Sequence, residues 1–184
     1  MVPLISLWLP IAAAAVLVFL VSSVLHMALK YHQADYKQLP DEAKQIDALR
    51  GLPPGYYHFP HCASMKEMGS PEMLEKFRRG PVGMLAVAPN GPPAMGKFLG
   101  LWFVYSVLVS LFAGYLASFT LDPGAHYLAV FRVTGTAAFM AYGLANMVDS
   151  IWKGMPWSNT IRATIDGLLY ALVTAGAFGW LWPR

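Results

Sequence analysis

Residues 4–28 read LISLWLPIAAAAVLVFLVSSVLHMA and contain no Asp, Glu, Lys or Arg. A helix needs about 20 apolar residues to cross about 30 Å of hydrocarbon at roughly 1.5 Å per residue. The stretch is therefore long enough to span a bilayer, and so are the apolar stretches 98–121, 127–148 and 161–182, of which only 98–121 also lacks charged residues. The sequence predicts an all-α polytopic membrane protein: a bundle of four transmembrane helices with a partly helical cytoplasmic loop, residues 29–97.

The composition agrees with this class. Of the 184 residues, 57% are hydrophobic and only 12% are charged, whereas a soluble domain has about 25% charged residues. The single cysteine, Cys62, excludes an internal disulfide and any zinc or iron–sulfur site built from several cysteines. No Lys or Arg precedes the first stretch, so we expect a permanent span there rather than a cleavable signal peptide.

The basic residues indicate the orientation. The connection between the first two spans carries nine of the thirteen, and residues 120–126 carry none. The nine are Lys30, Lys37, Lys44, Arg50, Lys66, Lys76, Arg78, Arg79 and Lys97. Because cytoplasmic loops are enriched in Lys and Arg, we predict a multi-pass protein of the bacterial inner (cytoplasmic) membrane with both termini outside. These bases flank spans and lack interleaved aromatic side chains, so we expect no nucleic-acid partner.

Small residues recur every four positions in three spans and form ridges that allow close helix approach in lipid. The ridges are Ser106, Ser110, Gly114 and Ser118; Gly167, Ala171, Ala175 and Gly179; and Ala137, Ala141 and Ala145. They favour close packing of the last three spans against one another within one chain. The alternative is that a ridge packs against a helix of a partner protein. The bulkier first span, which contains Pro10, is expected at the periphery.

The long connection should be partly ordered. Proline and acidic residues at 40–42 and Ser70-Pro71-Glu72 are typical helix starts, while Gly51 and Gly80 are typical ends. Residues 82–87 could form a strand or a surface-lying segment. Residues 91–97, GPPAMGK, match seven positions of a phosphate-binding loop, but two prolines lack the N–H groups that hold phosphate. We interpret them as a turn into the membrane.

One set of potential metal ligands lies in this connection, in the sequence His58-Phe-Pro-His61-Cys62. Imidazole and thiolate suit zinc, copper or haem iron, and His26 or His32 could supply a fourth ligand if the connection folds back. The alternative is a loop that docks its aromatic and proline side chains. No catalytic residue is predicted, because no third group orients Cys62 and its neighbouring histidines.

Polar residues in or near the spans predict a cluster in the inner leaflet. Its members are His26, Asn146, Asp149, Arg162 and Asp166. Two helical pairs are expected within it, Asp149 with Lys153 and Arg162 with Asp166. The cluster could fix helix register or serve as a proton or ion waypoint. Near the outer side, Arg132 is expected to anchor the third span by snorkelling outward or by meeting Asp122.

Four segments carry a family resemblance: Pro60-His61-Cys62, Arg79–Val82, Gly91–Lys97 and Asp166–Tyr170. The chain resembles, over most of its length, an uncharacterised family of small bacterial four-span membrane proteins. The resemblance implies a bacterial inner membrane and carries no activity or cofactor.

Three functions are compatible with the sequence. The first is a non-catalytic accessory, scaffold or assembly protein without a cofactor, whose partners are the lipid bilayer and a membrane protein or a second copy of the chain. The second is a metal- or haem-binding membrane protein. The third is a small ion or proton transporter built on Asp149, Arg162 and Asp166.

Overall fold

The computed structural model describes residues 1–184, which divide into two compact units. The first, the bundle unit, comprises Met1–Tyr36, Ala94–Ser150 and Met155–Arg184. The second, the loop unit, comprises Lys37–Pro93 with Ile151–Gly154.

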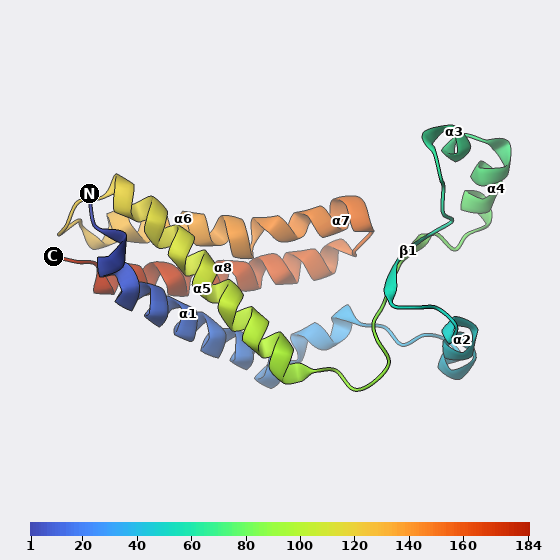
Figure 1. Cartoon of the computed structure of the whole chain (residues 1–184), viewed down its shortest axis with the longest axis horizontal. Coiled ribbons are helices and arrows are strands. Elements are labelled where there is room, and N and C mark those ends of the chain that lie inside the picture. Colours follow the sequence, from blue (N-terminus) through green and yellow to red (C-terminus); the bar gives the residue numbers. More distant parts are fainter. The chain divides into compact units, whose positions relative to one another are not determined.

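Four long apolar helical segments make up the bundle unit, as Figure 1 shows. The first combines a 3-10 turn at Leu4–Leu7, helix α1 at Trp8–Ser23 and a π-helical turn at Val24–Ala28. The others are α5 (Met95–Thr120), α6 (Tyr127–Tyr142) continued by α7 (Met147–Lys153), and α8 (Trp157–Leu181). The residues of α7 from Ile151 onward are assigned to the loop unit. All four are long and apolar enough to cross a membrane, which confirms the predicted fold class.

The first span is not peripheral, contrary to the prediction. Helix α1 packs on both α5 and α8, and α6 packs on α8 and α5. Leu7, Ala14, Ala15 and Val18 are fully buried. The run of alanines gives α1 a narrow face on which its neighbours approach closely, and this outweighs the bulk of the other faces.

Two of the three small-residue ridges pack inside the bundle unit. Ser106, Ser110, Gly114 and Ser118 of α5 are buried, as are Gly167, Ala171 and Ala175 of α8. The third ridge is only partly confirmed. Ala137 and Ala141 are half-buried, and Ala141 packs against the core, but Ala145 is exposed and the buried residues of α6 are Val130, Thr134, Ala138 and Tyr142. Thr134 tolerates burial because its hydroxyl donates to the Val130 carbonyl at 2.8 Å.

Both chain termini lie at the same end of the bundle unit (Figure 1). The Met1 ammonium contacts Asp122 Oδ1 at 3.1 Å, and the Gly124 N–H donates to the Pro183 carbonyl at 2.8 Å. The carboxylate of Asp122 therefore meets the N-terminus rather than Arg132, whose side chain is exposed.

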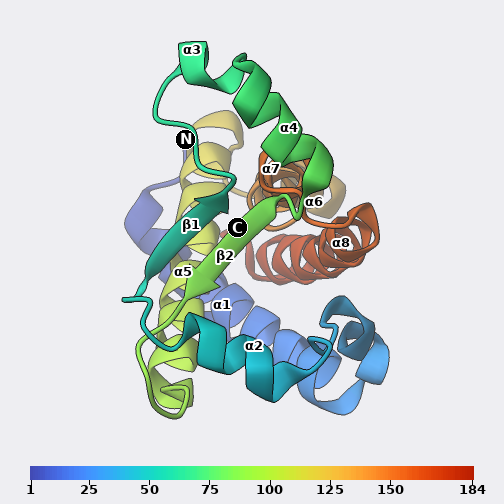
Figure 2. The same cartoon turned by 90° about the vertical axis from the view of Figure 1, so that its right-hand side faces the viewer.

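The loop unit contains α2 (Glu42–Leu49), β1 (Gly55–Phe59), α3 (Met65–Met68), α4 (Pro71–Arg79) and β2 (Gly83–Val87). Strands β1 and β2 pair antiparallel, as Figure 2 shows, and Gly55 lies opposite Val87. The Ser70 hydroxyl caps α4 by accepting from the Met73 N–H at 3.2 Å. Only Met73 is fully buried among residues 37–93, so this unit has almost no core.

Candidate functional site

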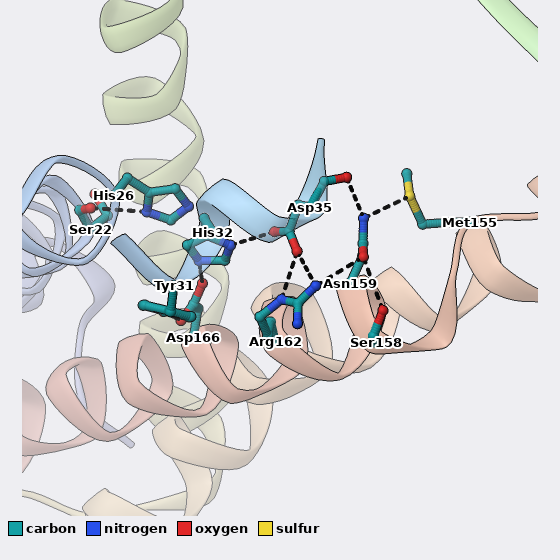
Figure 3. A network of polar contacts seen from close by, with 10 residues as sticks. All are labelled: Ser22, His26, Tyr31, His32, Asp35, Met155, Ser158, Asn159, Arg162 and Asp166. Atoms are coloured by element: carbon teal, nitrogen blue, oxygen red, sulfur yellow. Dashed lines mark hydrogen bonds and ion pairs between the residues drawn. The ribbon is translucent and has the colours of Figure 1, made fainter. Parts of the chain in front are cut away.

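The chain turns sharply where the first span ends. Leu29 is extended, with φ −93° and ψ 130°, between the π-helical turn and a 3-10 turn at Lys30–Asp35. This second turn places Tyr31, His32 and Asp35 against α8 (Figure 3). Contacts here join residues more than 120 positions apart in the sequence.

Helix α8 supplies the other half of the site from one of its faces. Asn159, Arg162 and Asp166 lie at positions i, i+3 and i+7, which share a helical face. Asp166 is only 3% exposed. A buried carboxylate is costly unless it is hydrogen-bonded or paired, so its partners decide what the site can do.

Asp166 has two such partners, and both come from the segment after the first span. His32 Nε2 lies 2.7 Å from Asp166 Oδ2, and the Tyr31 hydroxyl donates to Oδ1. Each carboxylate oxygen therefore has a separate hydrogen-bond donor. Tyr31 fixes the rotation of the carboxylate and leaves Oδ2 directed at the imidazole (Figure 3).

Asp35 is the second carboxylate of the site. Its Oδ2 lies 2.6 Å from His32 Nδ1, and Arg162 Nε donates to Oδ1 at 2.6 Å. The Asn159 amide donates to the Asp35 backbone carbonyl at 3.0 Å. Asp35 thus joins the histidine to α8 through an ion pair and fixes the imidazole from the side opposite Asp166.

These contacts shift the titration of the residues after the span. Burial alone would lower the pKa of His32, but the hydrogen bonds to Asp35 and Asp166 outweigh it and raise that pKa above its ordinary value. At Asp35, burial alone would raise the pKa, but the hydrogen bonds and charges of His32 and Arg162 outweigh it and lower that pKa. Burial and the bond to Asp166 raise the pKa of Tyr31, so its hydroxyl remains a donor.

His26 lies beside His32 at the end of the first span. The two rings stack, with centroids 4.5 Å apart and planes 11° apart. His26 Nδ1 lies 3.0 Å from the Ser22 carbonyl oxygen, and because a carbonyl only accepts, this nitrogen carries the hydrogen. The ligand atoms of His26, His32 and Asp166 all lie within 4.8 Å of one another, so the three residues could hold a metal ion.

The structure brings together three of the five residues of the predicted polar cluster: His26, Arg162 and Asp166. The predicted pairing of Arg162 with Asp166 was wrong, because Arg162 pairs with Asp35. Asp35 was missed because it lies outside the spans, on a turn whose position the local sequence does not reveal. The pairing of Asp149 with Lys153, both in α7, stays a prediction.

Asn146 has a different role from the one predicted. Its side-chain amide donates to the carbonyls of Tyr142 at 2.7 Å and Gly143 at 3.1 Å. Both carbonyls lie where α6 ends and a 3-10 turn at Leu144–Asn146 begins, and the Gly143 carbonyl also accepts the backbone N–H of Asn146 at 3.2 Å. Asn146 therefore stabilises the break within the third span, since freed carbonyls are costly in lipid.

The ligands proposed from sequence in the loop unit are not gathered in this way. His58 lies on β1 with its Nδ1 3.1 Å from the Pro60 carbonyl oxygen, and Cys62 is a half-buried free thiol. The group that brings three potential ligand atoms within 4.8 Å is His26, His32 and Asp166, and it includes none of His58, His61 and Cys62. One sequence feature could have indicated the site that the structure shows. His32 and Asp35 are spaced three residues apart just beyond a span.

Fold and site together define the chain as a multi-pass four-helix bundle with a buried polar site at one end. No family model matches it, and no curated protein or solved structure shows significant similarity.

Proposed function

We propose that this protein is a non-catalytic accessory protein of the bacterial inner membrane that presents its loop unit to a partner protein in the cytoplasm. The nine basic residues of 29–97 support this orientation. In this arrangement both termini and residues 121–126, which lie at one end of the bundle unit, face outward.

The observation that carries the proposal is the poor burial of the loop unit. Between residues 37 and 93 only Met73 is fully buried, and exposed apolar side chains occur on its helices and strands. Ile46 of α2, Tyr56 of β1 and Leu74 of α4 are 51%, 60% and 44% exposed. Apolar surface gains about 25 cal/mol for each Å² removed from water, so exposed apolar surface of this kind favours contact with another protein.

The test is capture of the partner from membranes solubilised in mild detergent. A variant with Ile46→Ser, Tyr56→Ser and Leu74→Ser should lose the partner, because all three side chains are exposed and their loss disturbs little packing. Phe112→Ser is the matched control, since this residue is exposed on α5 within the bundle unit and should leave capture unchanged. Recovery of the unaltered chain as a free monomer would refute the proposal.

Thiol labelling tests the orientation separately. In a Cys62→Ser background, Lys44→Cys should resist a membrane-impermeant reagent in intact cells and react after the cells are opened. Pro123→Cys, in the connection between α5 and α6, should react in intact cells. The reverse pattern would place the loop unit outside.

A further inference from the structure

We propose that His26, His32 and Asp166 bind one divalent first-row transition metal ion, Zn²⁺ or Fe²⁺, at the end of the bundle unit. This inference is independent of the accessory function, since it rests on a different part of the molecule. It places the metal ligands at the end of the first span, on the 3-10 turn that follows it and on the last span, rather than in the loop unit.

The orientation of the ligands is the main argument. A metal-binding histidine nearly always donates its second ring N–H to a carboxylate or a backbone carbonyl, and ligating carboxylates are themselves hydrogen-bonded. All three residues have such a partner: Ser22 O for His26, Asp35 for His32 and the Tyr31 hydroxyl for Asp166. The atoms left free to ligate an ion are His26 Nε2, His32 Nε2 and Asp166 Oδ2, of which the last two already lie 2.7 Å apart (Figure 3).

The spacing of these atoms is close to what an ion requires. Zinc binds nitrogen and carboxylate oxygen at about 2.0–2.2 Å, so two ligand atoms of one ion lie up to about 4 Å apart. The three residues have their ligand atoms within 4.8 Å of one another. Because nearly parallel stacked rings cannot both direct a nitrogen at one ion, binding requires the His26 ring to turn out of its stack with His32. The His26 side chain is exposed and is held only by that stacking and one hydrogen bond.

Charge also favours a cation at this position. Asp166 is almost completely buried within the last membrane-spanning helix, and an ion bound to Oδ2 would neutralise it directly. Binding exchanges the hydrogen bond between His32 Nε2 and Asp166 Oδ2 for two metal–ligand bonds, and the Nε2 hydrogen leaves as a proton to water. Arg162 stays paired with Asp35 on the other side of the imidazole.

The donor set selects the class of ion. Two imidazoles and one carboxylate suit zinc or ferrous iron, and a site with three protein ligands keeps at least one open position. Mg²⁺ and Ca²⁺ prefer oxygen ligands alone. Haem does not fit, because the stacked rings lie face to face and cannot ligate iron from opposite sides of a porphyrin.

The experiment uses the full chain, purified in detergent, stripped with a chelator and titrated with Zn²⁺, with Fe²⁺ under anaerobic conditions, and with Mg²⁺. We expect one Zn²⁺ or one Fe²⁺ per chain and no competition from Mg²⁺. Co²⁺ serves as a spectroscopic probe, because its visible absorption reports nitrogen and oxygen ligands directly. Zn²⁺ is expected to bind more tightly than Fe²⁺ at such a site, so the metal that copurifies with the chain, measured before chelation, distinguishes a zinc site from an iron site.

Variants assign the ligands. His26→Ala should weaken binding at least about 100-fold, and Tyr31→Phe, which only removes the bond to Asp166, should weaken it about tenfold and alter the Co²⁺ spectrum. The matched control replaces His58 and His61 with Ala and Cys62 with Ser, and should bind as tightly as the original chain.

Three outcomes would overturn the proposal. They are the absence of stoichiometric binding, an unchanged affinity in His26→Ala, and loss of the metal only in the loop-unit control. Asp166→Asn could fail to fold, and in that case His26→Ala decides, since its exposed ring contributes little to packing and size-exclusion chromatography verifies the fold.

Discussion

Replacement of Gly167 by alanine tests the closest approach in the bundle unit. A Cβ at this position would lie 2.5 Å from both the Cα and the nitrogen of Gly143. These are backbone atoms, so no side-chain rotation relieves the contact. Ordinary van der Waals contact between such atoms begins near 3.4 Å, so α8 and α6 must move apart locally by about 1 Å.

The energetic cost follows from this displacement. A radial gap of about 0.5–1 Å forfeits a quarter to a half of each dispersion contact, and α6 with α8 is the most extensive helix pair of the bundle unit. Overpacking of this kind costs about 1–3 kcal/mol. A clash with backbone atoms lies at the upper end of this range, and alanine recovers about 0.5–1 kcal/mol through its better helix propensity, so we expect a net loss of about 2 kcal/mol.

The assay is unfolding by sodium dodecyl sulfate in mixed micelles, followed by tryptophan fluorescence. Gly176→Ala is the matched control on the same helix, because the nearest atom to its added Cβ is the Tyr127 hydroxyl oxygen at 3.9 Å. The control should be as stable as the original chain or slightly more stable. Equal stability of the two variants would refute the close contact between α6 and α8.

Three further predictions use the polar contacts of the bundle unit. Asn146→Ala removes the side-chain donor to the Tyr142 and Gly143 carbonyls and leaves Gly143 with only the backbone N–H of residue 146. It should cost about 1 kcal/mol in the same assay; no loss would show that these carbonyls do not need the side-chain donor. Ser22→Ala removes the acceptor of the Trp102 indole N–H, now at 2.8 Å, and should also cost about 1 kcal/mol. Ser23→Ala should be neutral, because this hydroxyl bonds only to the carbonyl of Phe19 in its own helix, and a larger loss there would contradict the assignment. Arg162→Gln breaks the ion pair with Asp35 and should speed trypsin cleavage after Lys30 about tenfold, read by mass spectrometry. Arg50→Gln, from the exposed pair with Asp47, should leave that rate unchanged, and equal rates in the two variants would argue against the Asp35 contact.

The spans could be predicted because lipid imposes a simple rule: a helix must be apolar over a fixed length. The first was predicted at 4–28, and the structure has Leu4–Ala28. The third extends further than predicted, to Lys153, because polar residues continue the helix beyond the apolar stretch. Hydropathy cannot detect this continuation, nor the break that Gly143 and Asn146 make within it.

The site was only partly predictable. Its intramembrane members, Arg162 and Asp166, stood out because a charge within a span is expensive. Tyr31 and Asp35 did not, because polar residues just beyond a span are ordinary. Their positions depend on a turn that folds back on α8, and a contact between residues 127 positions apart leaves no local pattern. The buried face of α6 was missed for a related reason, since alanines lie on more than one face of that helix.

The π-helical turn at Val24–Ala28 makes the first span sensitive to single-residue insertions and deletions. Such a turn holds one residue more than the α-helical turn that it replaces. Deleting one residue there would leave a segment still long enough to cross the bilayer, yet it would swing the following chain by about 100° around the helix axis. In this region an apolar segment that is long enough to cross the bilayer is therefore not sufficient. The number of its residues must also stay the same, because that number sets the direction in which the following chain leaves the helix.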